Sequence, residues 1–246
     1  QLLDFMLSKK AEDLCRPEDE QKALESSQDM RTYSSILNPY EELLCSVILS
    51  RPISHMLGLR TIRTILNEPY NFTSAKKTQE AGAKTWQQAV YDAKTQHKDK
   101  TAQQIGGAAD VVLAKFTSDD DEDGTQLGKV LENEDVNDAL DGLKREVKGF
   151  GATSIDIFLR RVQWMWKHAF PYIDGKSADS LRDLGLPMNG EELEELLNTH
   201  WKDLDTSEVA GDDEASKKRR AFVILLERAT GAGLENRLEQ VKEAAA

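Results

Sequence analysis

The sequence is poor in cysteine and lacks any long apolar run. Cys15 and Cys45 are too few for a four-cysteine zinc or iron–sulfur site. Cys45 lies in an apolar run and is most simply a small core residue, so we expect reducing, intracellular surroundings. A bilayer-spanning helix needs roughly 20 consecutive apolar residues, and no segment comes near that length. We therefore expect no membrane partner.

Strand-like alternation of apolar and polar residues is also missing, whereas helical spacing recurs along the chain. Asn38, Pro39 and Glu41 stand in the order of an N-cap, a first-turn proline and a third-position acid, which predicts a helix start. Further helices are expected at about 53–67, from Thr73 or Ser74 to a break near Gly82, and at 83–98, 101–116, 155–162 and 222–226. The fold class is predicted to be all-α.

The formal net charge of −12 argues at first sight against a nucleic-acid partner. Its distribution changes that interpretation. Residues 115–143 carry ten acids and two bases (−8), and residues 189–216 carry ten acids and one base (−9). Residues 51–100 hold nine bases and four acids (+5), and residues 144–168 hold six bases and two acids (+4). The basic stretches can meet a phosphate backbone.

Three polar segments have simple interpretations. Residues 119–124 form an acidic linker that lacks the alternating ligands and closing glutamate of a calcium loop, so a solvated loop is favoured. Residues 205–216 are expected to be a second loop. The Lys-Lys-Arg-Arg run at 217–220 fits a helix start, a phosphate contact or a nuclear signal, with a solvated helix face as the default.

The most informative segment has two glycines, Gly149 and Gly151, bracketed by the apolar Val147 and Phe150 and followed by an amphipathic helix. Glycine permits backbone angles that a Cβ forbids and lets another backbone approach closely. The helix that follows would begin with free N–H groups and a positive dipole end, which is a phosphate site. The alternative is a glycine turn between two core helices. The flanking apolar residues and the local charge favour the phosphate site.

Residues 147–156 resemble the hairpin of the endonuclease III-like helix-hairpin-helix DNA glycosylase superfamily, whose usual form is Leu-Pro-Gly-Val-Gly-x-Lys-Thr-Ala. Residues 38–50 resemble the early helix of that family, which also ends in Leu-Ser. The segment Phe-Pro-Tyr-Ile-Asp at 170–174 resembles the one that carries the essential aspartate of the family. Asp174 lies 23 residues beyond Gly151, close to the family spacing, and the resemblance covers about residues 38–187.

The resemblance implies two helical subdomains with a DNA-binding cleft. One would be a bundle of residues 36–163 that ends in the hairpin, and the other would combine 1–35 with 164–246. The hairpin residues implied to bind DNA are Lys148, Gly149, Phe150, Gly151, Thr153 and Ser154. The main-chain carbonyls of Arg145, Val147 and Phe150 are implied to bind a monovalent cation. The expected partner is double-stranded DNA carrying a lesion, bound by a monomer, in the nucleus if the source is eukaryotic.

The resemblance assigns catalysis to Asp174, whose carboxylate would stabilise positive charge on the sugar while the damaged base leaves. From the residues alone, Asp174 is a helix N-cap. Thr153 stands where strand-nicking members have the lysine that attacks the sugar, so hydrolysis without lyase activity is implied. Base-pocket candidates are Arg51, His55, Trp164 and Tyr172, each with a core or surface role as the alternative. No cofactor is required and no iron–sulfur cluster is expected.

A non-enzymatic function stays open. Where the family has Asp-Thr-His, this chain has Asp174-Gly175-Lys176, and its overall charge is acidic. Both features favour a catalytically inactive helix-hairpin-helix module that binds DNA or a protein. A more distant alternative is a helical scaffold in which the hairpin is only a turn.

Overall fold

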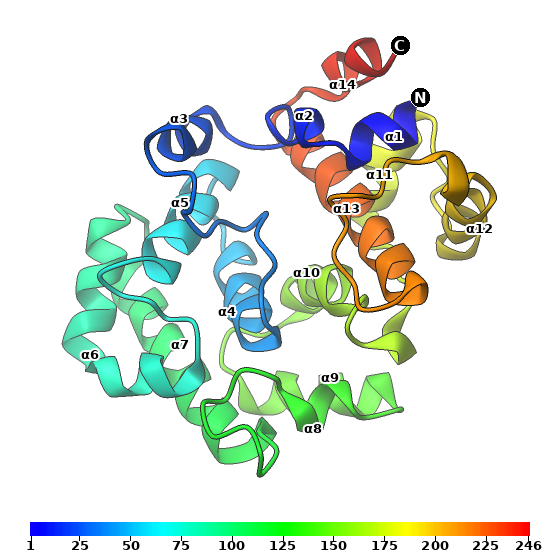
Figure 1. Cartoon of the computed structure of the whole chain (residues 1–246). Coiled ribbons are helices and arrows are strands. Elements are labelled where there is room, and N and C mark those ends of the chain that lie inside the picture. The colour runs from blue at the N-terminus through cyan, green and yellow to red at the C-terminus, as the bar shows by residue number, and fades with distance from the viewer. The chain divides into compact units, whose positions relative to one another are not determined.

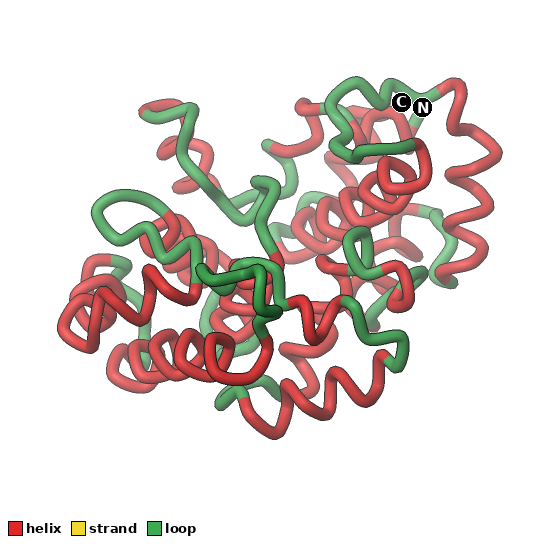
Figure 2. The backbone as a smooth tube through the Cα atoms, turned by 60° about the horizontal axis from the view of Figure 1, so that its bottom comes forward, coloured by secondary structure: helices red, strands yellow, loops and turns green.

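A computed structural model describes all 246 residues of the chain. It contains fourteen α-helices and no β-strand (Figure 2), which confirms the all-α prediction. No helix combines the length and the apolar character that crossing a membrane requires.

The chain divides into two compact units: residues 22–158, and residues 1–21 together with 159–246. The boundaries lie at 21/22 and 158/159, whereas the sequence placed them at 35/36 and 163/164. Hydrogen bonds between the backbone of Arg31 and the side chain of Asn67 hold the segment around Arg31 in the unit 22–158. The N–H of Arg31 donates to Asn67 Oδ1 at 2.9 Å, and Asn67 Nδ2 donates to the Arg31 carbonyl at 2.8 Å.

Helices α3 to α10 lie wholly or partly in the unit 22–158 (Figure 1). They are α3 (Glu18–Ser26), α4 (Pro39–Leu49), α5 (His55–Leu66), α6 (Ala75–Asp92), α7 (Lys98–Val111) with its π-helical end (Val112–Phe116), α8 (Gly128–Leu131), α9 (Val136–Glu146) and α10 (Ala152–Val162). Helices α3 and α10 cross the boundaries of the unit.

Helix α4 begins as its sequence predicts. The Glu41 N–H donates to Asn38 Oδ1 at 2.9 Å, and the Asn38 N–H donates to the Glu41 carboxylate at 2.8 Å, which completes a capping box. The helix is buried from Pro39 to Ile48, so it forms the centre of the core of its unit. The fully buried Glu41 carboxylate also accepts from Arg31 Nη2 at 2.6 Å, which balances its charge.

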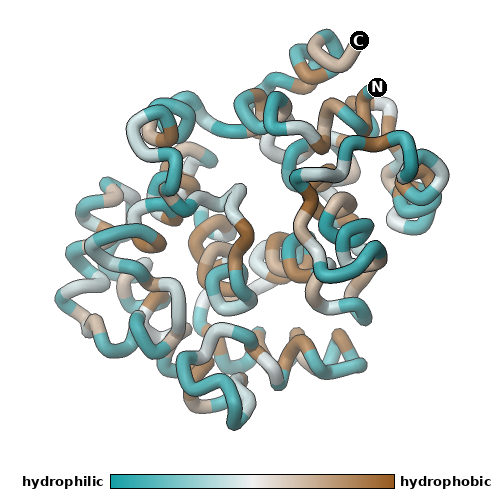
Figure 3. The backbone as a smooth tube through the Cα atoms, viewed as in Figure 1, coloured by the Kyte–Doolittle hydropathy of each residue, from teal (hydrophilic) through white to brown (hydrophobic).

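Helices α6 and α7 pack against each other. Gly82 interrupts α6 with a φ of +79°, which confirms the predicted break. The acidic loop that follows α7 is strongly hydrophilic (Figure 3). Within it the Asp121 carboxylate accepts the N–H groups of Thr125 at 3.0 Å and Gln126 at 2.8 Å, so this acid shapes the turn.

The other unit is built around one long helix, α13. Its helices are α1 (Leu2–Leu7), α2 (Lys9–Glu12), a 3-10 turn (Lys167–Ala169), α11 (Gly175–Leu184), α12 (Gly190–His200), a 3-10 turn (Trp201–Asp203), α13 (Glu214–Leu234) and α14 (Leu238–Ala245). Phe222, Leu225 and Leu226 of α13 are fully buried, which confirms the predicted late helix. Helix α11 packs along α13.

Candidate nucleic-acid interface

The turn between α9 and α10 is anchored by its two apolar residues. Val147 and Phe150 are buried, and the Phe150 ring meets the edge of Phe158 at 5.7 Å between centroids. Lys148 and Gly149, between the two anchors, are exposed. Burial of the flanking apolar groups thus holds the intervening backbone at the surface.

Gly149 is required by both its backbone and its neighbours. Its φ is +94°, in the left-handed region. A Cβ at this position would lie 2.4 Å from Gln104 Nε2 and 3.3 Å from Val47 Cγ1, so the turn packs directly on α7 and α4. The buried Ser154 hydroxyl donates to the Gly149 carbonyl at 3.0 Å. Ser154 therefore fixes the turn from inside.

Replacing Gly149 by alanine is expected to destabilise the protein. A side chain in this backbone conformation costs about 1–2 kcal/mol, and the contact with Gln104 adds to that cost. Chemical denaturation of the two proteins measures the difference. Gly151→Ala is the matched control, because Gly151 has no heavy atom within 4 Å of its Cβ position and its φ is not positive. Equal stability of Gly149→Ala and Gly151→Ala would contradict this account of the turn.

The N-terminus of α10 faces open space. Ala152 and Thr153 are exposed, and their N–H groups have no acceptor within the protein. The first intrahelical bond runs from the Ile155 N–H to the Gly151 carbonyl at 2.9 Å. The helix therefore presents unpaired N–H donors and its positive dipole end to solvent, which favours an anion there.

Basic side chains dominate the approach to this turn. Lys144 and Lys148 are exposed and pair with no carboxylate. Glu146, the residue before Val147, accepts from Lys115 Nζ at 2.6 Å and from Arg145 Nε at 3.2 Å. These hydrogen bonds hold the pKa of Glu146 below its ordinary value. The charge of Glu146 is therefore balanced within the protein.

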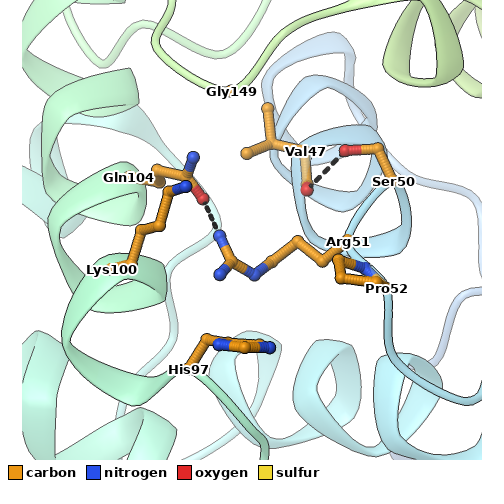
Figure 4. A pocket seen from close by; sticks show the side chains of 8 residues that line it. All are labelled: Val47, Ser50, Arg51, Pro52, His97, Lys100, Gln104 and Gly149. Carbon is orange, nitrogen blue, oxygen red and sulfur yellow. Dashed lines mark hydrogen bonds between the residues drawn. The ribbon is translucent and has the colours of Figure 1, made fainter.

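A pocket of about 270 Å³ opens beside the turn (Figure 4). It is lined by the end of α4, the start of α7 and the hairpin glycine: Val47, Ser50, Arg51, Pro52, His97, Lys100, Gln104 and Gly149. Two of these residues, Arg51 and Lys100, are cationic and none is acidic. The pocket and the turn share Gly149, so they are adjacent in the unit 22–158.

Arg51 reaches across this pocket from α4 to α7. Its Nη1 donates to Gln104 Oε1, while its buried Nε has no acceptor. Neither Arg51 nor Lys100 forms an ion pair. Burial lowers the pKa of Arg51, because a guanidinium is less stable away from water. The pocket thus contains a partly desolvated cation without a counter-ion.

Asp174 belongs to the other unit, where it caps α11. Its Oδ1 accepts from the N–H groups of Lys176 at 3.1 Å and Ser177 at 3.2 Å, and its Oδ2 accepts from the Ser177 hydroxyl at 2.6 Å. Arg160 makes a bidentate ion pair with the same carboxylate, at 2.8 Å from Nε and 3.1 Å from Nη2. Both oxygens are therefore engaged by the protein.

The surroundings of Asp174 stabilise its charged form. Burial alone would raise the pKa of Asp174, but the charge of Arg160 and the hydrogen bonds from Arg160 and Ser177 together lower it. The residue is only 4% exposed. A carboxylate enclosed in this way supports the helix start and the ion pair. In this conformation it offers no free oxygen to the sugar of a nucleotide.

The four predicted base-pocket residues do not come together in one unit. Arg51 lines the pocket described above, and His55, at the start of α5, does not. Trp164 and Tyr172 lie in the other unit. The Arg220 guanidinium covers the Trp164 ring at 5.2 Å, and the backbone of Tyr172 pairs with the side chain of Gln163 at 2.7 and 2.9 Å.

Two hairpin residues have inward-facing roles. The side chains of Phe150 and Ser154 are buried, so only their backbone can face a ligand, whereas Lys148 and Thr153 are exposed. The Val147 carbonyl, one of the three implied cation ligands, accepts the Phe150 N–H at 3.1 Å. The cation site stays a prediction.

Sequence reasoning missed Lys100, Gln104 and His97 as pocket residues. The available signal was spacing, since residues four apart share one face of a helix. Lys100 and Gln104 have that spacing on α7. Nothing in the sequence showed that this face of α7 lies against the end of α4 and the hairpin.

Comparisons with protein-family profiles, with curated proteins and with solved structures found no match to this chain.

Proposed function

We propose that this chain is a helix-hairpin-helix protein that binds the phosphate backbone of double-stranded DNA. Of the two functions that the sequence left open, this is the non-catalytic one. The observation that carries the proposal is the free, exposed N–H groups of Ala152 and Thr153. These N–H groups lie at the start of α10, a helix of 11 residues. The pocket beside the turn is lined by Arg51 and Lys100 and by no acidic residue.

Phosphate is the ligand class that suits these groups. Backbone N–H donors and the positive end of a helix bind phosphate without any side chain, and exposed lysines add attraction to a charged strand. The exposure of Lys148 and the open space at Gly151 are therefore expected of a backbone-binding hairpin.

The acidity of the chain limits where DNA can bind. Much of the negative charge lies in 115–143 and 189–216, outside the hairpin and the lining of the pocket. DNA should therefore be attracted to a small basic surface and repelled elsewhere. Such binding depends on a few phosphate contacts and weakens steeply as salt displaces them.

A salt titration of duplex binding tests the proposal. The logarithm of the binding constant should fall linearly with the logarithm of salt concentration, with a slope of about −0.9 for each phosphate contact. Lys148→Ala should weaken binding on every sequence and make the slope shallower by about one unit. Lys84→Ala, an exposed lysine on α6 outside the pocket, should leave affinity and slope unchanged. Absence of duplex binding at low salt would contradict the proposal.

Base excision at Asp174 is the second candidate. In its favour stands the resemblance of residues 170–174 to the segment that carries the essential aspartate of the glycosylases, and the surroundings of Asp174 stabilise its charged form by lowering its pKa. One oxygen would have to be released by Arg160 or Ser177 before it could face a sugar. The substrate would be a damaged or mispaired base, which is less costly to extrude from the duplex.

The chemistry of this second candidate is monofunctional hydrolysis. Thr153 offers no amine to the sugar, so the product would be an intact abasic site. The experiment is a screen of damaged and mismatched oligonucleotides, with alkali to reveal abasic sites and borohydride to trap covalent adducts. Alkali-dependent breakage without a trapped adduct would support base excision. A trapped adduct would contradict the monofunctional assignment.

A further inference from the structure

The acid-free pocket beside the hairpin has features that backbone binding by the α10 N-terminus does not require. We infer that this pocket is a separate binding site for one phosphoryl group, held by Arg51 and Lys100. The inference does not depend on the proposed function, because a free phosphate compound can occupy the pocket whether or not the hairpin binds DNA.

The first support is the uncompensated charge of Arg51. Withdrawing a cation from water is unfavourable unless an opposite charge or hydrogen bonds replace the solvent. Gln104 satisfies Nη1 of Arg51, but Nε is buried without an acceptor and no carboxylate pairs with the side chain. A bound anion would supply the missing counter-charge. The side chain is already held across the pocket by Gln104, which reduces the ordering needed on binding (Figure 4).

The second support is the second cation. Lys100 lies one helical turn before Gln104 on α7, lines the same pocket and pairs with no acid. Two cations that share a small space repel each other when it is empty, and an anion between them removes that repulsion. His97 also lines the pocket and lies below Arg51 in the view of Figure 4.

The third support is the size and the donor set. At about 270 Å³ the pocket lies below the range of roughly 300–1,000 Å³ that is usual for drug-sized ligands. It suits a small anionic group attached to something outside. A planar guanidinium together with an ammonium matches the several oxygens of a phosphoryl group. Val47 and Pro52 add apolar surface to the lining beside these polar groups.

Titration calorimetry with inorganic phosphate tests the inference, with chloride added to hold ionic strength constant. The parent protein should bind phosphate at one saturable site. Lys100→Ala and Arg51→Met should each weaken binding about tenfold or more, because each removes a charge-assisted hydrogen bond to the anion. Lys84→Ala removes the same charge outside the pocket and should leave binding unchanged. Lys100 is exposed, so its alanine variant should fold even if Arg51→Met does not.

The source of the phosphoryl group is distinguished with two duplexes of one sequence, one with a 5′ phosphate and one with a 5′ hydroxyl. Tighter binding of the phosphorylated duplex, lost in Lys100→Ala, would identify a strand end. Saturable binding of free phosphate with equal affinity for both duplexes would identify a small phosphate compound. Failure of phosphate to bind at tens of millimolar, or binding that survives both pocket substitutions, would overturn the inference. If the parent protein binds inorganic phosphate but does not bind duplex DNA, only the proposed function is overturned.

Discussion

Replacing Asp174 by alanine is expected to lower the free energy of unfolding by about 3–5 kcal/mol, the usual effect of removing one partner of a buried ion pair. The substitution would take from the buried guanidinium of Arg160 its bidentate carboxylate partner, while the carboxylate of Glu227 lies farther away at 3.3 Å. It would also remove the acceptor for the first N–H groups of α11, a loss of about 1 kcal/mol when a cap is deleted. Urea denaturation followed by circular dichroism measures the change.

An exposed pair provides the control for this prediction. Asp179 pairs with Arg182 at 2.9 Å, and both side chains are more than half exposed. Asp179→Ala should change stability by less than about 1 kcal/mol, because water screens such pairs. If Asp174→Ala were as stable as Asp179→Ala, the carboxylate of Asp174 would have no structural role. Its burial would then need another explanation, and catalysis would be the first one to consider.

The same ion pair predicts how stability depends on pH. The folded-state pKa of Asp174 is lowered, while an aspartate in the unfolded chain has a pKa of about 3.9. Its stabilising contribution is therefore complete above that value, declines as the pH falls below it, and is lost as the pH passes through the folded-state pKa. Between these values the parent should lose stability more steeply than Asp174→Ala.

Asp174→Asn separates the two candidate functions. It keeps the shape of the side chain and removes the charge, so a catalytic carboxylate would lose base release by orders of magnitude while DNA binding stayed. Our proposal expects no base release from the parent protein on any lesion in the screen. Base release by the parent that disappears in a folded Asp174→Asn protein would replace the proposed function with base excision.

The local elements of the fold could be predicted from the sequence because their causes are local. The Asn38 capping box, the break at Gly82 and the apolar stripe of α13 each depend on residues within a few positions of one another. The attachment of the segment around Arg31 to the unit 22–158 involves instead its pairing with Asn67, and pattern reasoning cannot find a pair so far apart along the chain.

The candidate site also combines features with local causes, which the sequence predicts, and features that depend on residues far apart in the sequence. The turn and the exposed start of α10 could be expected from the two glycines, the apolar residues beside them, the amphipathic helix that follows and the local charge. The pocket could not, because Arg51, Lys100 and Gly149 meet only through the packing of α4, α7 and the hairpin. Asp174 shows a third case. Its N-cap role was visible in the sequence, whereas its partner Arg160 lies on α10, and no local pattern links the two residues.

The second large effect is expected at Gly151, where DNA binding and stability should separate. The space around its Cβ position is open, so Gly151→Val should fold. Its side chain would cover the N–H groups that begin α10 and should weaken duplex binding about tenfold or more, a loss of roughly 1.4 kcal/mol or more. Gly175→Val is the matched control, since Gly175 begins α11 and also has open space around it. Equal weakening by both variants would point to a general effect of valine at a helix start.

The most direct measurement is the duplex affinity of Gly151→Asp at low salt. Aspartate is a favourable residue before a helix start, so this variant should be at least as stable as the parent. Its carboxylate would occupy the free N–H groups and repel a phosphate. Gln87→Glu makes the same change of charge at an exposed position on α6. We predict that Gly151→Asp loses duplex binding while Gln87→Glu binds as the parent does. Parent-like affinity of a stably folded Gly151→Asp protein would contradict the account.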